Sequence, residues 1–102
     1  MIHVLAEIET TEGRREAFLE EFKKVVPLVL EEPGCIEYGA TIDASTELER
    51  QAPLRKDTVT IVEKWSGIEA LQAHLDSGHM AAYRERVKDH VAGATLRILE
   101  PA

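Results

Sequence analysis

The stretch 58–80 constrains the fold most, because a strand and a helix meet in it with almost no linker. Residues 58–65 are rich in β-branched side chains and alternate in polarity, which predicts a strand ending at the single tryptophan, Trp65. Ser66-Gly67-Ile68-Glu69 fits a capping box, so we expect Ser66 to cap a helix. Asp76-Ser77-Gly78 predicts a break and a second N-cap before the helical pattern resumes. Because side chains alternate along a strand, four residues would share one face: Val59, Ile61, Glu63 and Trp65.

The rest of the chain also alternates between strand and helix periods. Residues 2–9, 35–42 and 94–99 are interpreted as strands, and 18–29 as part of an amphipathic helix. Pro27 lies inside that helix, where it predicts a kink or a restart. We expect the second helical region to end at Gly93.

The resulting order, β-α-β-β-α-β, predicts a single α+β domain over 1–102 with a ferredoxin-like antiparallel sheet and both helices on one face. The other sheet face would carry apolar side chains and must be covered. A second subunit packing sheet against sheet is the simplest cover, and we expect a homodimer. Depending on register, the apolar residues of that face are Leu5, Val62 or Ile61, and Leu99 or Ile98.

Residues 43–57 form a long polar connection between the second and third strands. Loops of about 15 residues without regular structure are uncommon in compact domains, and those that occur are often lids or binding loops. This loop is interpreted either as a cover for a pocket, as an extension of the dimer contact, or as a solvated hairpin.

Composition excludes several classes of function. Twelve basic and nineteen acidic residues give a net charge of −7, without a cluster of basic residues that would bind nucleic acid or an anionic membrane. The single cysteine, Cys35, cannot form an internal disulfide, and the N-terminus has no signal-peptide pattern. We therefore expect a soluble, cytoplasmic protein without a membrane span.

Two histidines near the second predicted cap are the clearest candidates for chemistry. His79 lies in the first turn of the second helical segment, where the helix dipole disfavours a protonated imidazole and suits a base. Tyr83 follows one turn later on the same side. The alternative is that His79 only caps or packs the helix end. His74 precedes the break, and two histidines without further ligands at recognised spacings do not indicate zinc, so no metal is expected.

Trp65 and Glu63 share one strand face, and each has two readings. Trp65 could form a pocket wall or plain core. Glu63 is either a buried carboxylate that needs a partner or a salt-bridge residue on the outer face. Cys35 is interpreted as an inert small apolar residue. No phosphate-binding loop, serine nucleophile elbow or dinucleotide fingerprint is present.

Taken together, the motifs resemble the antibiotic biosynthesis monooxygenase family. The resemblance rests on the Glu32-Pro33-Gly34-Cys35 turn, the Glu63-Lys64-Trp65 strand end and the run His74-Leu75-Asp76-Ser77-Gly78-His79. It implies a dimeric α+β barrel with a pocket between sheet and helices, and oxygenase activity on quinols or polycyclic phenols with O₂ and no cofactor. A haem-degrading branch uses an asparagine on its first strand, and this sequence contains no asparagine.

By that resemblance His79 would be the base or an orienting group. The residues expected to bind an aromatic substrate are Trp65, Tyr38, Tyr83, Met80 and His74. The chemistry needs an apolar pocket and a proton acceptor, because the phenolate can itself pass an electron to O₂. The alternative is a small-ligand-binding or stress-related dimer without turnover, since the scaffold also hosts non-enzymes.

Overall fold

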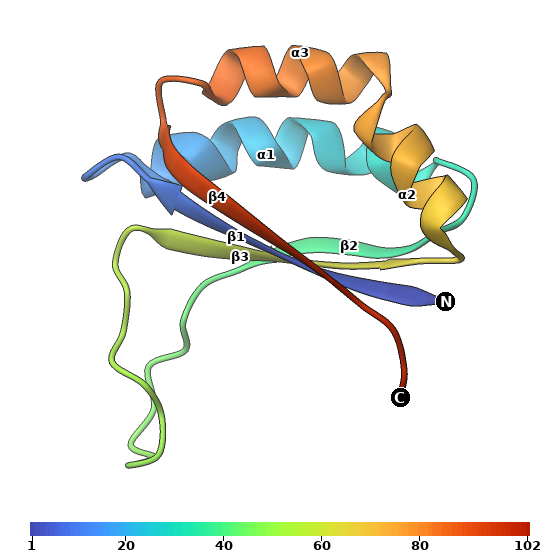
Figure 1. The fold of residues 1–102 in the computed structure, drawn as a ribbon. Coiled ribbons are helices and arrows are strands. Elements are labelled where there is room, and N and C mark those ends of the chain that lie inside the picture. Colours follow the sequence, from blue (N-terminus) through green and yellow to red (C-terminus); the bar gives the residue numbers. More distant parts are fainter.

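One four-stranded antiparallel sheet carries all three helices on a single face (Figure 1). The computed structural model describes residues 1–102, and its strand order is β2-β3-β1-β4. This arrangement confirms the α+β ferredoxin-like fold expected from the sequence. No helix is long and apolar enough to cross a bilayer. In chain order the elements are β1 (Ile2–Thr10), α1 (Arg15–Leu30), β2 (Cys35–Thr41), β3 (Thr58–Trp65), α2 (Ile68–Leu75), α3 (Gly78–Val87) and β4 (Val91–Leu99).

Strand register decides which residues face the helices. The predicted inner face of β3 is confirmed, and its glutamate is buried with the apolar residues around it. On the outer face Leu5 pairs with Val62 and with Arg97, while His3 pairs with Leu99. The outer apolar residues are therefore Leu5, Val62 and Leu99, because Ile61 and Ile98 alternate onto the helix side.

Helix α1 runs unbroken through Pro27, so the predicted restart does not occur. Proline removes one backbone hydrogen bond from a helix interior and costs about 3 kcal/mol there. Its ring is exposed here, whereas the opposite stripe is fully buried. Burial of that stripe offsets the missing bond. The buried residues are Phe18, Phe22, Val25 and Val29.

The two predicted caps differ in outcome. The prediction of a capping box at Ser66 is wrong. The N-cap of α2 is Gly67, and no side chain forms a capping hydrogen bond there. The Ser66 N–H instead donates to the Gly34 carbonyl at 2.8 Å, which ties this corner to the turn before β2. Gly34 has φ 83°, and a Cβ there would lie 2.5 Å from Ser66 Oγ, so the turn requires glycine. The second cap is confirmed, because the Ser77 hydroxyl accepts from the Met80 N–H.

The last helix ends earlier than expected. α3 stops at Val87, β4 begins at Val91, and Gly93 lies inside the strand opposite Glu9. Gly93 was expected to end the helix because glycine often follows a helix C-terminus. Pairing with β1 decides the boundary instead, and the His90 N–H closes the turn on the Val87 carbonyl at 2.8 Å.

An aromatic cluster holds α1 and α3 on the sheet. The Phe22 ring centroid lies 5.3 Å from that of Tyr38 on β2 and 6.0 Å from that of Tyr83 on α3. Phe18 lies one turn earlier, 6.2 Å from Phe22. Such pairs add about 0.5–1.5 kcal/mol each beyond the area that they bury.

Phe22→Ala should lower the free energy of unfolding by about 3–5 kcal/mol, because it opens a void where three elements meet. Leu28→Ala is the matched control, since Leu28 is exposed on the same helix. That change should stay within about 0.5 kcal/mol. Urea unfolding followed by far-UV circular dichroism measures both, and equal losses would contradict the assigned core.

Candidate active site

A cavity of about 490 Å³ opens between the inner face of the sheet and helices α2 and α3. We call it the apolar cavity, because 12 of its 17 lining residues are hydrophobic. A space of this size is in the usual range for sites that bind small molecules. The lining residues with a side chain able to donate, accept or ionise are Tyr38, Glu63, His74, Tyr83, Arg84, Lys88 and Thr95.

Glu63 provides a buried carboxyl at this cavity. Strand alternation turns it inward on β3, where it is only 5% exposed. Its Oε1 accepts a hydrogen bond from Trp65 Nε1 at 2.9 Å. Burial raises the pKa of Glu63 to about 7, and the tryptophan bond offsets part of that effect. The group can therefore exchange a proton near neutral pH.

His74 provides an imidazole at the same cavity. It is 1% exposed, and its ring centroid lies 4.6 Å from that of Trp65 and 5.3 Å from that of Tyr38. Burial lowers the pKa of His74, although the nearby Glu32 carboxylate opposes this effect. The ring is therefore held neutral in a fixed orientation.

Two phenols also belong to the polar part of the lining. Burial raises the pKa of both Tyr38 and Tyr83, so their hydroxyl groups stay protonated. They can donate hydrogen bonds to an oxygen atom of a bound molecule. Met80 borders the cavity beside them, as the stripe of α3 at steps of three and four predicts.

The expectation that Trp65 and His79 border one cavity is wrong. Trp65 is fully buried behind the lining and reaches the cavity only through its bond to Glu63. His79 does not line the cavity, and its Nε2 lies 2.8 Å from Glu32 Oε2. The Ser77 cap aims Met80 inward, and the neighbouring His79 is rotated about 100° from it around the helix axis. The candidate proton acceptors of the cavity are therefore Glu63 and His74.

Glu32 is the residue that the sequence analysis missed. It follows α1, and its carboxyl group was assigned no role in the site from the sequence. The Glu-Pro-Gly turn, which is part of the family resemblance, was the available signal. Its Oε2 lies 2.9 Å from His74 Nδ1 and 2.8 Å from His79 Nε2, and we call these three residues the Glu32–histidine cluster.

The cluster contains residue types that can also hold a metal ion. The three facing atoms all lie within 4.8 Å of one another. Both facing ring nitrogens are at hydrogen-bond distance from one oxygen, so their bonding needs are already met. We therefore interpret the group as a hydrogen-bonded cluster.

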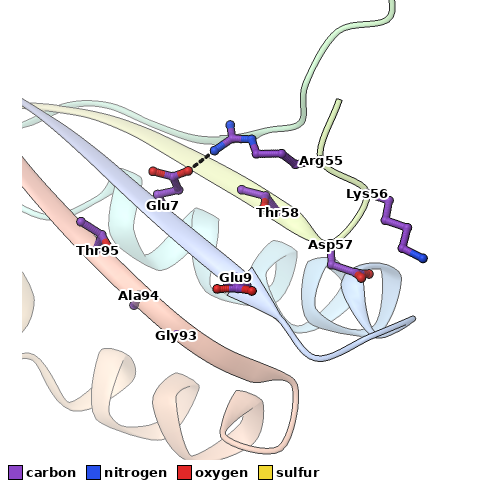
Figure 2. A pocket seen from close by; sticks show the side chains of 9 residues that line it. All are labelled: Glu7, Glu9, Arg55, Lys56, Asp57, Thr58, Gly93, Ala94 and Thr95. Carbon is purple, nitrogen blue, oxygen red and sulfur yellow. Dashed lines mark hydrogen bonds and ion pairs between the residues drawn. The ribbon is translucent and has the colours of Figure 1, made fainter. Parts of the chain in front are cut away.

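A second hollow, on the outer side of the sheet, is lined mainly by charged and polar groups (Figure 2). Arg55 reaches it from the end of the 43–57 loop and forms an ion pair with Glu7 on β1. The same guanidinium bonds to Asp43 and lowers the pKa of that carboxyl to about 2. These charges anchor the loop to itself and to the sheet.

The loop 43–57 does not act as a lid over the apolar cavity. It extends from the sheet on the side away from the helices (Figure 1), and none of its residues lines the cavity. The interpretation of this loop as a cover for the pocket is therefore wrong.

Comparison with known proteins places the chain in a family. Residues 1–86 match the antibiotic biosynthesis monooxygenase family, and the chain belongs to it. The chain is 41% identical over 103 residues to the Escherichia coli K12 protein named probable quinol monooxygenase YgiN, covering 99% of this chain and 98% of that protein. The Shigella flexneri protein of the same name matches equally.

Solved structures share the fold at lower identity. A conserved protein from Methanosarcina mazei superposes with a TM-score of 0.82 at 22% identity, over 99% of this chain and 92% of that one. A Bacteroides thetaiotaomicron protein described as of unknown function, a possible oxidoreductase, superposes with a TM-score of 0.79 at 26% identity, over 98% of this chain and 96% of that one.

The raised pKa of Glu63 should make stability depend on pH. In the unfolded chain this carboxyl ionises near its ordinary pKa of 4.5, whereas in the folded protein it keeps its proton to about pH 7. The folded state binds more protons in that window, so this contribution is fully present below pH 4.5 and is lost as the pH rises to about 7. Its full size is on the order of 3 kcal/mol.

Glu63→Gln should abolish that fall, because the amide does not ionise and its oxygen can still accept from Trp65. Urea unfolding at a series of pH values measures the effect. Glu100→Gln, at the exposed end of the chain, is the control and should follow the wild type. Parallel stability curves for wild type and Glu63→Gln would show that Glu63 is not perturbed.

Proposed function

We propose that this protein is a cofactor-independent monooxygenase that oxidises quinols or polycyclic phenols with O₂. The observation that carries the proposal is the presence of two acid–base groups, Glu63 and His74, at the wall of a mostly apolar cavity. Membership of the family and the similarity to a protein named probable quinol monooxygenase support the choice of reaction.

The proposed reaction balances without a further redox partner. A quinol and O₂ give a hydroxyquinone and water: one oxygen atom enters the ring and the other leaves as water. The base breaks a phenolic O–H bond and takes the proton, while the electron pair stays on the oxygen. The electron-rich quinolate then reduces O₂ directly. The protein would supply position, deprotonation and exclusion of bulk water.

The cavity lining fits an aromatic diol. Its apolar walls would cover ring faces, and a volume of about 490 Å³ accommodates a molecule of two or three fused rings. The hydroxyl groups of Tyr38 and Tyr83 would donate to the substrate oxygen that is not being deprotonated. Both phenols keep their protons because burial raises their pKa values.

We also propose that a second copy of the chain covers the outer face of the sheet. Leu5, Val62 and Leu99 lie on that face without a helix over them, and Leu5 and Leu99 are 37% and 43% exposed. The 43–57 loop extends on the same side (Figure 1) and would contact the partner. The interpretation of this loop as part of the dimer contact therefore remains a proposal.

Oxygen uptake with 1,4-benzohydroquinone and 1,4-naphthohydroquinone tests the reaction. After subtraction of uncatalysed oxidation, the wild type should consume one O₂ per quinol and give the hydroxyquinone, identified by mass. The double variant Glu63→Gln with His74→Gln should lower kcat by about 100-fold or more, because both proton acceptors are lost.

His90→Gln is the matched control, since His90 bonds to Arg14 and does not border the cavity. Substrate binding without catalysed O₂ uptake would contradict the monooxygenase proposal and favour the alternative, a ligand-binding dimer without turnover.

Sedimentation equilibrium at micromolar concentration should show a dimer for the wild type. Leu5→Glu places a charge at the centre of the proposed interface and should shift the mass toward the monomer. Leu28→Glu, on the exposed side of α1, should remain dimeric. A monomeric wild type would overturn this arrangement.

A further inference from the structure

One carboxylate oxygen joins three elements beside the apolar cavity. Glu32, in the turn after α1, faces His74 at the end of α2 and His79 at the start of α3. The side chains of His74, Glu32 and His79 are 2%, 12% and 26% exposed, so the cluster leads from the interior toward the surface.

The cluster determines which nitrogen of His74 carries the proton. A carboxylate oxygen only accepts hydrogen bonds, so His74 Nδ1, at 2.9 Å from it, must be the donor. A neutral imidazole has a single N–H group. The lone pair of His74 is therefore on Nε2.

That lone pair has no hydrogen-bond partner within the protein. Every buried side-chain nitrogen and oxygen has a hydrogen-bond partner, and the side chain of His74 is bonded only through Nδ1. Nε2 is therefore at the accessible surface of the ring, and the open space that His74 borders is the apolar cavity.

We propose that His74 Nε2 is the proton acceptor of the site, and that Glu32 and His79 are positioning residues that act through it. The inference rests on the proposed function and adds the identity of the base. The phenolic O–H bond of the substrate breaks, its proton binds Nε2, and the electron pair stays on the substrate oxygen. The resulting imidazolium is stabilised by Glu32 through Nδ1–H, as in other carboxylate–histidine pairs.

His79 has a defined part in this arrangement. Its Nε2 lies 2.8 Å from the same Glu32 oxygen, so it donates a second hydrogen bond that holds the carboxylate in place. Arg84 of α3 is the further charged group near His74, and its guanidinium bonds to the Leu75 carbonyl. Because Arg84 bonds elsewhere, Glu32 is the only side chain that forms a hydrogen bond with the His74 ring.

The first test is independent of turnover. Long-range ¹H–¹⁵N NMR spectra of histidine-labelled protein report which ring nitrogen carries hydrogen. His74 should be the Nδ1–H tautomer in the wild type and a mixture of both tautomers in Glu32→Gln, because the amide lacks the charge that favours Nδ1–H. His90→Gln should leave the His74 signals unchanged. An Nε2–H tautomer in the wild type, or an unchanged tautomer in Glu32→Gln, would overturn the proposal.

The second test uses steady-state kinetics. Glu32→Gln should lower kcat by about 10- to 100-fold with little change in KM, because Glu32 does not line the cavity. His79→Ala should cause a smaller loss, and it keeps Glu32, so it serves if Glu32→Gln fails to fold. The double variant should be no slower than Glu32→Gln alone, since His79 acts through Glu32. Additive losses would overturn the linkage.

The two tests separate the two proposals. If no quinol is oxidised but the tautomer depends on Glu32, the proposed reaction fails and the orientation of His74 stands. If quinols are oxidised and Glu32→Gln is fully active, the reaction stands and the role assigned to His74 and Glu32 fails.

Discussion

A carboxyl group on the buried face of the sheet is the constraint on which the site depends. Removing an ionised carboxylate from water is costly unless it is paired, so such a group takes up a proton instead. Glu63 has one partner, the Trp65 N–H, and its pKa rises to about 7. Trp65 in turn packs against the ring of His74. Burial of one polar group thus places a carboxyl and an imidazole around the same tryptophan.

Short-range patterns predicted most of the fold, because period-two and helical spacing determine which residues are buried. They failed where tertiary contacts decide the outcome. Pro27 does not break α1, because its buried stripe outweighs one lost bond. Gly93 belongs to β4 because it pairs with Glu9 of β1, and the preference of glycine for helix ends does not reveal this pairing. Ser66 does not cap α2: its backbone N–H bonds to the Gly34 carbonyl, more than thirty residues earlier in the sequence, and the N-cap is Gly67.

The site was harder to predict than the fold for the same reason. Tyr38, Tyr83, Met80 and His74 border the cavity, as expected from strand alternation, helical spacing and the family resemblance. Glu32 lies 42 residues from His74 in the sequence, and no local pattern links them. His79 was assigned from its place at a helix start, and that place does not specify the direction of the ring. That direction is fixed by Glu32.

The cavity itself follows from small side chains on the sheet. Ala6 pairs with Ile61 on one side and Leu96 on the other, and Ala94 pairs with Ile8. Alanine at two inner positions leaves a gap beneath α3 that larger residues would fill at native packing density. The break at Asp76-Ser77 separates α2 from α3, so that His74 and Met80 approach the gap from different helices. A solved structure keeps this fold at 22% identity, and a shared fold does not by itself determine a chemistry.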